Sequence, residues 1–345
     1  MHLFSPFTLK GLHLKNRVVM PPMCQYSVDL EDGAPNEWHY VHYTSRAVGG
    51  AGLIIVEMTD VEPDGRISNR DLGIWSDAHV APFARIVEAV HRQDARIAVQ
   101  IAHAGRKAQD AAVPVAPSAI AFDERSPVPR ELTTGEAEAL VEKFGQAARR
   151  AVAAGMDAIE LHGAHGYLLH QFHSPLTNRR KDKYGADLLR FGVEAVQAVR
   201  SEMPSDMPLI MRVSAIEYAD GGYDLAYSRQ FCEAYRAAGV DMFHVSSGGE
   251  APVPPHRAPL SSPGYQVELA ADIRRTLQMP VIAVGLLDEP VLANDVVARE
   301  QTDLVAIGRA MLRDPYWAIH AARALGQPAN IPVPYERSFA PVSRK

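Results

Sequence analysis

From Ile159 to Tyr167 the chain reads Ile-Glu-Leu-His-Gly-Ala-His-Gly-Tyr, an apolar run that passes into a polar turn. The run follows Gly155, which ends an alanine-rich helical pattern, and its composition predicts a buried strand. His162 and His165 are three residues apart, so both lie on one side of the turn, and Tyr167 is two residues further on. Two imidazoles that donate hydrogen bonds, beside a phenol that donates a proton, can polarise a carbonyl and protonate its neighbour. A purely structural pair of histidines is the alternative that this stretch leaves open.

Eight short apolar runs of this kind recur along the chain, each after a glycine, a proline or a basic turn. They lack the alternation of apolar and polar residues, which is typical of strands buried on both faces. They cover residues 17–20, 52–56, 96–101, 157–161, 209–213, 241–245, 280–284 and 303–307. Helical patterns lie between them at residues 81–93, 134–154, 188–202, 227–238, 267–277 and 289–299, with Thr133 or Thr134 at one helix start and Gly155 and Gly239 at C-cap positions. This alternation predicts an α/β fold, a parallel (β/α)8 TIM barrel that forms a single domain over residues 1–345.

Three segments fit the alternation less well. Residues 27–37 form a polar loop in the first connection, which is the least regular. Residues 109–129 are rich in proline and alanine and predict a long loop on the active-site face. The tail, residues 328–345, holds four prolines and an aromatic segment, so we expect it to be frayed or docked on a neighbouring subunit.

The composition excludes several classes of function. The net charge of -6 argues against nucleic acid or an anionic membrane as the main partner. Cys24 and Cys232 are the only cysteines and form no Cys-x-x-Cys pair, so neither a disulfide framework nor an iron–sulfur cluster is supported. No apolar run approaches membrane-spanning length, and residues 1–15 lack the apolar region of a signal peptide. We therefore expect a cytoplasmic enzyme.

Polar residues and glycines gather where the predicted strands end. In barrels of this class the active site lies at the carboxyl ends of the strands. A purely structural barrel has no reason to place so many such residues at one end, so the sequence predicts an active site there. In chain order they are residues 21–26, Glu57, Gln100, residues 103–107, His162, His165, Tyr167, Arg212, residues 246–249, Gly285, Gly308 and Arg309.

A flavin site is predicted from the last of these residues. Gly285 and Gly308 follow the seventh and eighth strands, where such barrels commonly bind phosphate through backbone N–H groups. Arg309 adds a guanidinium suited to a two-point phosphate contact. The amide of Gln100 and the cation of Arg212 suit the ring of flavin mononucleotide (FMN), since its O2/N1 edge becomes anionic on reduction.

The chain resembles the Old Yellow Enzyme family, and within it the bacterial thermophilic-like ene-reductases that have a cysteine after Pro-Met. The resemblance runs from Phe4 to about Phe339. It rests on the motifs Pro22-Met23-Cys24-Gln25-Tyr26, His103-Ala104-Gly105-Arg106-Lys107, His162-x-x-His165-Gly-Tyr167 and Tyr335-Glu336-Arg337. It implies an FMN enzyme that is reduced by NADPH or NADH. Hydride would then pass from flavin N5 to the β-carbon of an activated alkene, such as an α,β-unsaturated carbonyl compound or a nitroalkene.

The resemblance also implies roles for single residues. His162 and His165 would hold the carbonyl or nitro oxygen of the substrate, and Tyr167 would protonate the α-carbon. Arg337 would reach into the active site of a neighbouring subunit, which implies a homodimer or a tetramer of dimers. Tyr26 and Lys107 would line the substrate site, and Cys24 would lie near the reactive edge of the flavin and tune its potential. The implied cofactor-binding residues are Pro22, Met23, Cys24, Gln100, Arg212, Gly285, Gly308 and Arg309, with no metal.

Three places depart from the family pattern. Residues 182–191 are contracted, so the loop after the fourth strand is shorter. Met58 stands where a small residue is common near the flavin and would narrow the pocket. The tail reads Tyr335-Glu336-Arg337-Ser338-Phe339 where Gly-Trp is typical of the family.

The remaining histidines have simpler interpretations. His170 and His173 follow the pair and are expected to pack against it or support it. Cys232, in a helical pattern, is expected to be a small buried hydrophobe. Surface or helix-face positions are predicted for His39, His42, His79, His91 and His320.

Other functions stay open at this point. His162 and His165 would serve as ligands in a metal-dependent lyase or hydrolase, although the sequence offers no obvious third ligand. Lys107 would be the nucleophile of a Schiff-base aldolase, although nothing marks it as desolvated. Arg212 has a structural alternative as an ion-pair partner of Glu57 or Glu160. Dienoyl-CoA reductases need cluster cysteines and a second domain, which this sequence lacks. The physiological substrate, the choice between NADPH and NADH, the stereochemistry and the oligomer size stay open as well.

Overall fold

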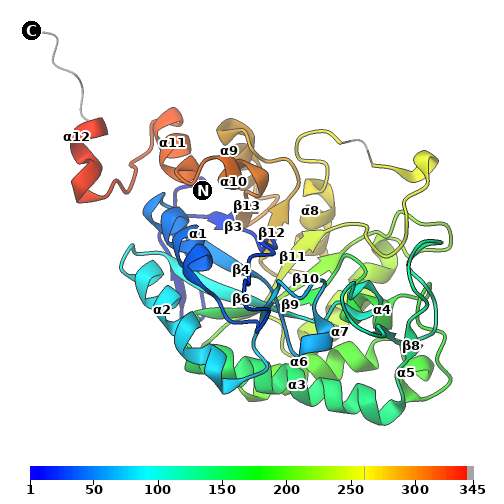
Figure 1. Cartoon of the computed structure of the whole chain (residues 1–345). Helices are drawn as coiled ribbons and strands as arrows, with labels where there is room; N and C mark the ends of the chain where they lie inside the picture. Colours follow the sequence, from blue (N-terminus) through cyan, green and yellow to red (C-terminus); the bar gives the residue numbers. More distant parts are fainter. Residues whose placement is uncertain (260, 340–345) are drawn as a thin grey trace, which may run out of the picture.

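The computed structural model describes residues 1–259 and 261–339 of the chain, and its centre is a closed barrel of eight parallel strands (Figure 1). Each strand pairs with the next and the last pairs with the first, so the prediction of a (β/α)8 TIM barrel is confirmed. In order around the barrel they are β3 (Val18–Met20), β4 (Leu53–Asp60), β6 (Arg96–Ala102), β9 (Ala158–Gly163), β10 (Leu209–Ser214), β11 (Met242–Ser246), β12 (Val281–Val284) and β13 (Leu304–Ala306).

Helices cover the outside of the barrel (Figure 1). From α1 to α8 they pack side by side along the ring, and α9 packs on α11. They are α1 (Glu37–Val48), α2 (Val80–His91), α3 (Thr134–Ala153), α6 (Arg190–Ser201), α7 (Leu225–Ala238), α8 (Val267–Leu277), α9 (Pro290–Ala298) and α11 (Trp317–Ala324). The shorter elements are α4 (Leu168–His173), α5 (Lys183–Ala186), α10 (Arg309–Arg313), α12 (Glu336–Phe339), β5 (Leu72–Gly73), β7 (Val115–Ala116), β8 (Arg130–Glu131) and the 3-10 turns Pro63–Gly65, Asp77–His79, Gly105–Lys107, Pro255–Arg257 and Val333–Tyr335.

The amino-terminal end of the barrel is closed by a hairpin that the sequence did not reveal. Its strands, β1 (Phe7–Leu9) and β2 (Leu12–Leu14), pair antiparallel, and Leu12 and Leu14 pack in one apolar cluster with residues from the starts of the barrel strands. Each strand has only three residues, too few for the apolar runs used to predict strands. The hairpin leaves the carboxyl end of the barrel as the open end.

Local signals account for several helix ends. Thr133 caps α3, with Glu136 completing a capping box, and Gly239 ends α7 with a φ of 124°. Gly155, with a φ of 84°, lies one residue beyond the C-cap of α3. These positions agree with the prediction to within one residue.

Helix α1 was missed, and three histidines expected at surface or helix-face positions are buried, two of them on α1. His39 and His42 lie on its buried face at 0% and 2% exposure, and His79 is 4% exposed. A surface position is therefore wrong for all three, although His39 and His42 do lie on a helix face. The N-cap Asn36 starts α1 inside the segment predicted as a polar loop. His39 Nδ1 lies 2.9 Å from the side-chain oxygen of the N-cap Asn36, and the ring of His42 packs on Tyr43.

The two remaining irregular segments are the long loop, residues 109–129, and the C-terminal tail. Residues 109–129 are a long loop, held by the pairing of β7 with β8. At the other end, α12 stands outside the ring of helices (Figure 1), and Phe339 packs under Arg323 of α11 at 4.9 Å. Of the predicted tail, residues 340–345 lie outside the described residues, so its contact with a neighbouring subunit stays a prediction. Among the described residues, no helix is both long and apolar enough to cross a membrane.

Candidate active site

The predicted residues of the middle strands meet at the carboxyl end of the barrel. Strand β9 runs to Gly163, so His162 lies on the strand itself, in register with Arg212 of β10. Arg212 is in turn in register with His244 of β11. Residues in register on paired strands are about 5 Å apart, so three nitrogen-bearing side chains lie next to one another. The sequence had not singled out His244.

His162, His165 and Tyr167 form one compact group. The rings of His162 and His165 are 5.2 Å apart and nearly perpendicular, and the rings of His162 and Tyr167 are 4.9 Å apart. Burial lowers the pKa of both histidines well below the usual value, and the nearby charge of Arg212 lowers it further. Burial also raises the pKa of Tyr167. At neutral pH the group therefore consists of two uncharged imidazoles and one protonated phenol.

The two histidines differ in their hydrogen bonds. His165 Nε2 lies 2.8 Å from Ser246 Oγ, whereas the buried Nδ1 of His162 has no hydrogen-bond partner among the described residues. Ser246 ends strand β11, where the sequence placed a site segment, but its contact with His165 was not predicted. An unpartnered buried nitrogen costs free energy, so a bound partner would stabilise this arrangement.

A cavity of about 270 Å³ opens beside Arg212. The buried Nε of Arg212 has no hydrogen-bond partner within the described part of the chain. At Gly285, φ is 130° and an added Cβ would lie 3.0 Å from Gln266 Nε2, so a side chain would be strained there. The predicted residues Pro22, Met23, Arg212, Gly285, Gly308 and Arg309 all line this cavity.

Gln100 belongs to a buried network behind this cavity. Its Nε2 donates to Glu160 Oε1 at 2.7 Å, and Glu160 Oε2 lies 2.8 Å from His244 Nδ1. Because Glu160 is held by these two residues, it forms no ion pair with Arg212. Glu57 is likewise held by the hydroxyl of Tyr43 at 2.9 Å rather than by Arg212. No ion pair joins Arg212 to either carboxylate among the described residues, although the charge of Glu160 raises the pKa of the Arg212 guanidinium against the effect of burial.

A second cavity, of about 290 Å³, is lined in part by Tyr167. Tyr26 and Lys107 line it, as predicted for a substrate site, and Phe122, Ser126 and Pro127 come from the long loop 109–129. That loop therefore lies on the active-site face, as expected.

Lys107 is more buried than the sequence indicated. Burial lowers the pKa of its amine to about 8, so the expectation that nothing desolvates it was wrong. The amine donates to the carbonyl oxygens of His165 at 2.8 Å and Gly249 at 2.6 Å. These bonds tie the amine of Lys107 to two backbone carbonyl groups, which disfavours its role as a Schiff-base nucleophile.

Cys24 is half-buried and packs in an apolar cluster with Met58 and Tyr167. Burial, together with Asp71 and Glu57, raises the pKa of its thiol well above the usual value, so it is a thiol at neutral pH. Met58 packs beside Cys24 and Tyr167, and its narrowing of the pocket stays a prediction. The predicted effect of Cys24 on a flavin potential stays a prediction.

Two predicted features lie apart from this site. Arg337 lies on the exposed helix α12 and does not line either cavity of its own chain. Among the described residues, the one group of metal-ligand type is His170, Glu217 and Glu250, which does not include His162 or His165. The metal-dependent alternative therefore lacks a third ligand. The sequence gave no signal for Glu217 or Glu250, because neither lies at the end of a predicted strand.

Comparison with known proteins places this geometry in a family. The model of the NADH:flavin oxidoreductase / NADH oxidase family matches residues 2–327. The chain belongs to this family. The NADPH dehydrogenases of Geobacillus thermodenitrificans (strain NG80-2) and Bacillus subtilis (strain 168) are 46% and 45% identical over 340 residues, which are 98% of this chain and 98% and 99% of theirs.

Solved structures agree with the assignment. Morphinone reductase in complex with tetrahydroNAD is 30% identical with a TM-score of 0.78, over 97% of this chain and 93% of that chain. A 2-naphthoyl-CoA reductase, 24% identical with a TM-score of 0.87 over 94% of this chain and 52% of that chain, shares the fold. The resemblance to the Old Yellow Enzyme family is confirmed, and the protein is an oxidoreductase with FMN and NAD(P)H as its cofactors.

Proposed function

We propose that the protein is an FMN-dependent ene-reductase that reduces α,β-unsaturated carbonyl compounds or nitroalkenes with NADPH or NADH. When bound, FMN would supply the hydride chemistry, from the nicotinamide nucleotide to the β-carbon of the alkene by way of flavin N5, and the protein would orient the reactants. The observation that carries the proposal is the meeting of two neutral imidazoles and a protonated phenol beside residues of two cavities. Tyr167 lines the second cavity, and the histidines lie next to Arg212 and Ser246, which line the first.

The first cavity fits FMN. Arg212 offers a buried cation with an unpartnered Nε, which suits the edge of the ring that becomes anionic. Since Glu160 takes the amide nitrogen of Gln100, the amide oxygen is left to accept from the ring. Gly285, Gly308 and Arg309 would bind the phosphate, because a Cβ-free backbone and a guanidinium line the same wall. Pro22, Met23 and Cys24 would contact the remaining faces of the cofactor.

His162 and His165 would donate hydrogen bonds to the substrate oxygen. Withdrawal of charge into this oxygen makes the β-carbon electron-poor, which is the effect of an oxyanion hole. Neutral imidazoles suit this role, because each carries one N–H at a pH where the phenol of Tyr167 is also protonated. Tyr167 Oη would then give its proton to the α-carbon of the alkene.

The surroundings of the second cavity would select the substrate. Tyr26 and the aromatic ring of Phe122 would contact the body of the alkene, and Lys107 would line its edge. We further propose that residues 1–345 form a single domain and that the protein acts as a dimer or tetramer in which Arg337 reaches a neighbouring active site. The exposed position of Arg337 on α12 supports this proposal.

The test is the visible spectrum of the purified protein, recorded before and after anaerobic addition of NADPH and then of 2-cyclohexenone. We expect a flavin spectrum that bleaches with NADPH and returns with the enone. Bleaching without return for any activated alkene or nitroalkene would refute the ene-reductase proposal while keeping the flavin.

A further inference from the structure

The turn that carries His165 has an unusual backbone. His165 and Gly166 are both left-handed, with φ of 59° and 73°. This conformation is uncommon for a residue with a Cβ and persists where the surroundings hold it. A Cβ on Gly166 would lie 2.2 Å from the carbonyl oxygen of Gly249, so the turn also packs directly on the loop after β11. The position of the His165 ring therefore depends on what holds this turn.

The two backbone N–H groups and the two carbonyl groups of His165 and Gly166 all form hydrogen bonds with side chains of other residues. One of the four partners is a histidine, and its role depends on where its proton lies. The partners are Ser214 Oγ for the His165 N–H (3.1 Å), Lys107 Nζ for the His165 carbonyl (2.8 Å), Gln171 Nε2 for the Gly166 carbonyl (2.7 Å) and His170 Nδ1 for the Gly166 N–H (3.0 Å).

The contacts of His170 define its tautomer. A backbone N–H only donates, so Nδ1 must be free of a proton to accept from Gly166. The proton of a neutral ring then lies on Nε2, which faces Glu217 Oε1 at 3.2 Å and Tyr223 Oη at 3.0 Å. Tyr223 gives its own proton to the carbonyl of Ser214 at 2.6 Å, so its oxygen is left to accept. Both sides of the ring require the same tautomer.

Glu217 can serve only as an acceptor in this arrangement. Its Oε1 faces His170, and its Oε2 accepts the backbone N–H of Tyr223 at 2.9 Å. An amide in place of the carboxylate would set an NH2 group against one of these two donors. If it met the Tyr223 N–H, two donors would oppose each other. If it met His170, the ring would change tautomer and place a second N–H against that of Gly166.

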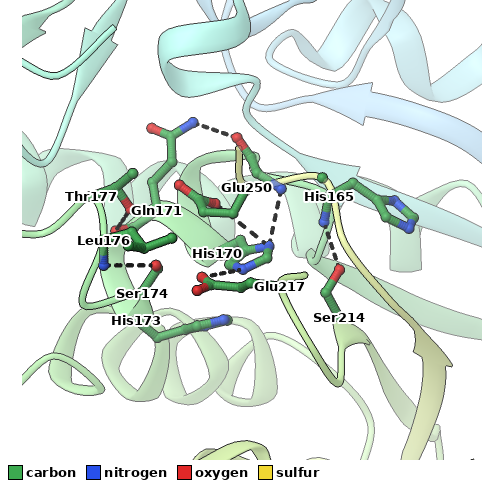
Figure 2. Close-up of polar contacts among 12 residues, drawn as sticks. His165, His170, Gln171, His173, Ser174, Leu176, Thr177, Ser214, Glu217 and Glu250 are labelled. Atoms are coloured by element: carbon green, nitrogen blue, oxygen red, sulfur yellow. Dashed lines mark hydrogen bonds and ion pairs between the residues drawn. The ribbon is translucent and has the colours of Figure 1, made fainter. Parts of the chain in front are cut away.

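The same cluster has the residue types of a metal site, but most of its groups already have partners (Figure 2). The exception is Glu250 Oε2, which has no hydrogen-bond partner among the described residues. Both ring nitrogens of His170 have partners within the protein. Glu250 lies on the other side of the ring, with its Oε2 at 3.6 Å from Nδ1, and its Oε1 accepts from the buried guanidinium of Arg106 at 3.0 Å. A cation would face Arg106 and would displace the Gly166 N–H. The geometry favours a hydrogen-bond network over a metal centre.

We propose that His170 and Glu217 are positioning residues: Glu217 holds His170 in the Nε2–H tautomer, and His170 Nδ1 holds the Gly166 N–H, which keeps His165 aimed at the active site. The two residues act through the turn and contact no substrate. The proposal rests on the proposed function for its kinetic readout, but its central claim, the tautomer, is measured independently of any reaction.

The test uses the FMN-bound enzyme labelled with 15N-histidine. Long-range proton–nitrogen correlation separates ring nitrogens that carry a proton from those that do not, and the His170 signals are assigned by their loss in His170→Asn. The key variant is Glu217→Gln, which keeps the shape of the side chain. Tyr223→Phe disturbs the same cluster but leaves Glu217 and Gly166 to define the tautomer. Glu194→Gln is the matched control, since Glu194 accepts from a tyrosine hydroxyl outside this cluster, that of Tyr184.

We expect the Nε2–H tautomer in the wild type, in Tyr223→Phe and in Glu194→Gln, and a population of the Nδ1–H tautomer in Glu217→Gln. Enone reduction by Glu217→Gln should fall on the order of 10²-fold, because a small misplacement of a binding group has that effect. An Nδ1–H or doubly protonated His170 in the wild type would overturn the proposal, as would an unchanged tautomer or rate in Glu217→Gln. Equal losses in Glu217→Gln and Tyr223→Phe without a change of tautomer would show a structural role alone.

Discussion

Two pairs of histidines lie within twelve residues of one another, and they are built differently. His162 and His165 lie beside residues that line the first cavity, since His162 is in register with Arg212 and His165 Nε2 is 2.8 Å from Ser246 Oγ. A buried nitrogen of His162 has no partner in the described part of the chain. His170 and His173 are stacked on each other at 5.0 Å and bond to Glu217, Tyr223 and Tyr235. Burial lowers the pKa of all four. Burial and a perturbed pKa therefore do not identify a binding site, whereas an unpartnered polar atom beside a cavity does.

The largest effect is expected at His162 and His165, the outer pair. We expect the double variant His162→Ala and His165→Ala to lose at least about 10³-fold in alkene reduction, because removal of a single oxyanion-hole donor already costs about 10²–10³-fold. Steady-state enone reduction measures this loss, and an intact flavin spectrum is the control. A loss below tenfold would place the oxyanion contact on other residues.

Tyr167→Phe should give the next largest effect. Removal of the proton donor should slow reoxidation of the enzyme by the enone about 10²–10⁴-fold, the usual range for general acid catalysis. Reduction of the flavin by NADPH needs no proton from Tyr167 and should change little. Stopped-flow absorbance separates the two steps, and equal slowing of both would remove Tyr167 as the donor.

For His170 and His173, the inner pair, the main effect of substitution should be on the stability of the fold. His170→Ala leaves the carboxylate of Glu217 buried without its neutral imidazole partner, and loss of a buried hydrogen bond to a charged group costs about 1.5–3 kcal/mol. The free energy of unfolding from urea titration measures this cost. A loss under 1 kcal/mol, about the net value of one hydrogen bond, would show that the cluster does not stabilise the fold.

The smallest effect concerns pH. His173 is neutral in the folded protein because burial lowers its pKa, whereas in the unfolded chain it takes a proton near pH 6.5. The unfolded state therefore binds more protons as the pH falls below about 6.5, and stability is lost in that direction. His173→Phe should reduce this loss by up to about 1.4 kcal/mol per pH unit between pH 6.5 and pH 5. An identical pH dependence in the variant would show that His173 takes up a proton in the folded protein at the same pH as in the unfolded chain.

Much of the barrel was predictable because buried parallel strands give continuous apolar runs, and all eight predicted runs overlap barrel strands. The strand-end rule also brought His162, Arg212 and the glycines Gly285 and Gly308 to one end. Helix α1 was not predicted, because its buried face carries His39, His42 and Tyr43 in place of aliphatic residues. Their burial depends on partners such as Glu57 that are distant in sequence.

The support of the site was not predictable for a related reason. Glu217 and Glu250 lie in loops after strands, with no periodic pattern to place them. Their roles follow from contacts with His170 and Arg106, which are 47 and 144 residues away in sequence. Strand patterns position the residues of a site, whereas the side chains that hold them are found only from the fold.

The division between the two histidine pairs is tested most directly by two matched substitutions. His162→Phe and His173→Phe replace a histidine by the same ring, eleven residues apart, and each FMN-bound variant is titrated anaerobically with a phenol that forms a long-wavelength band with the flavin. We predict that His162→Phe loses the band and that His173→Phe keeps it with nearly the wild-type dissociation constant. Equal weakening in both variants, or loss in His173→Phe alone, would contradict the assignment of binding to the outer pair.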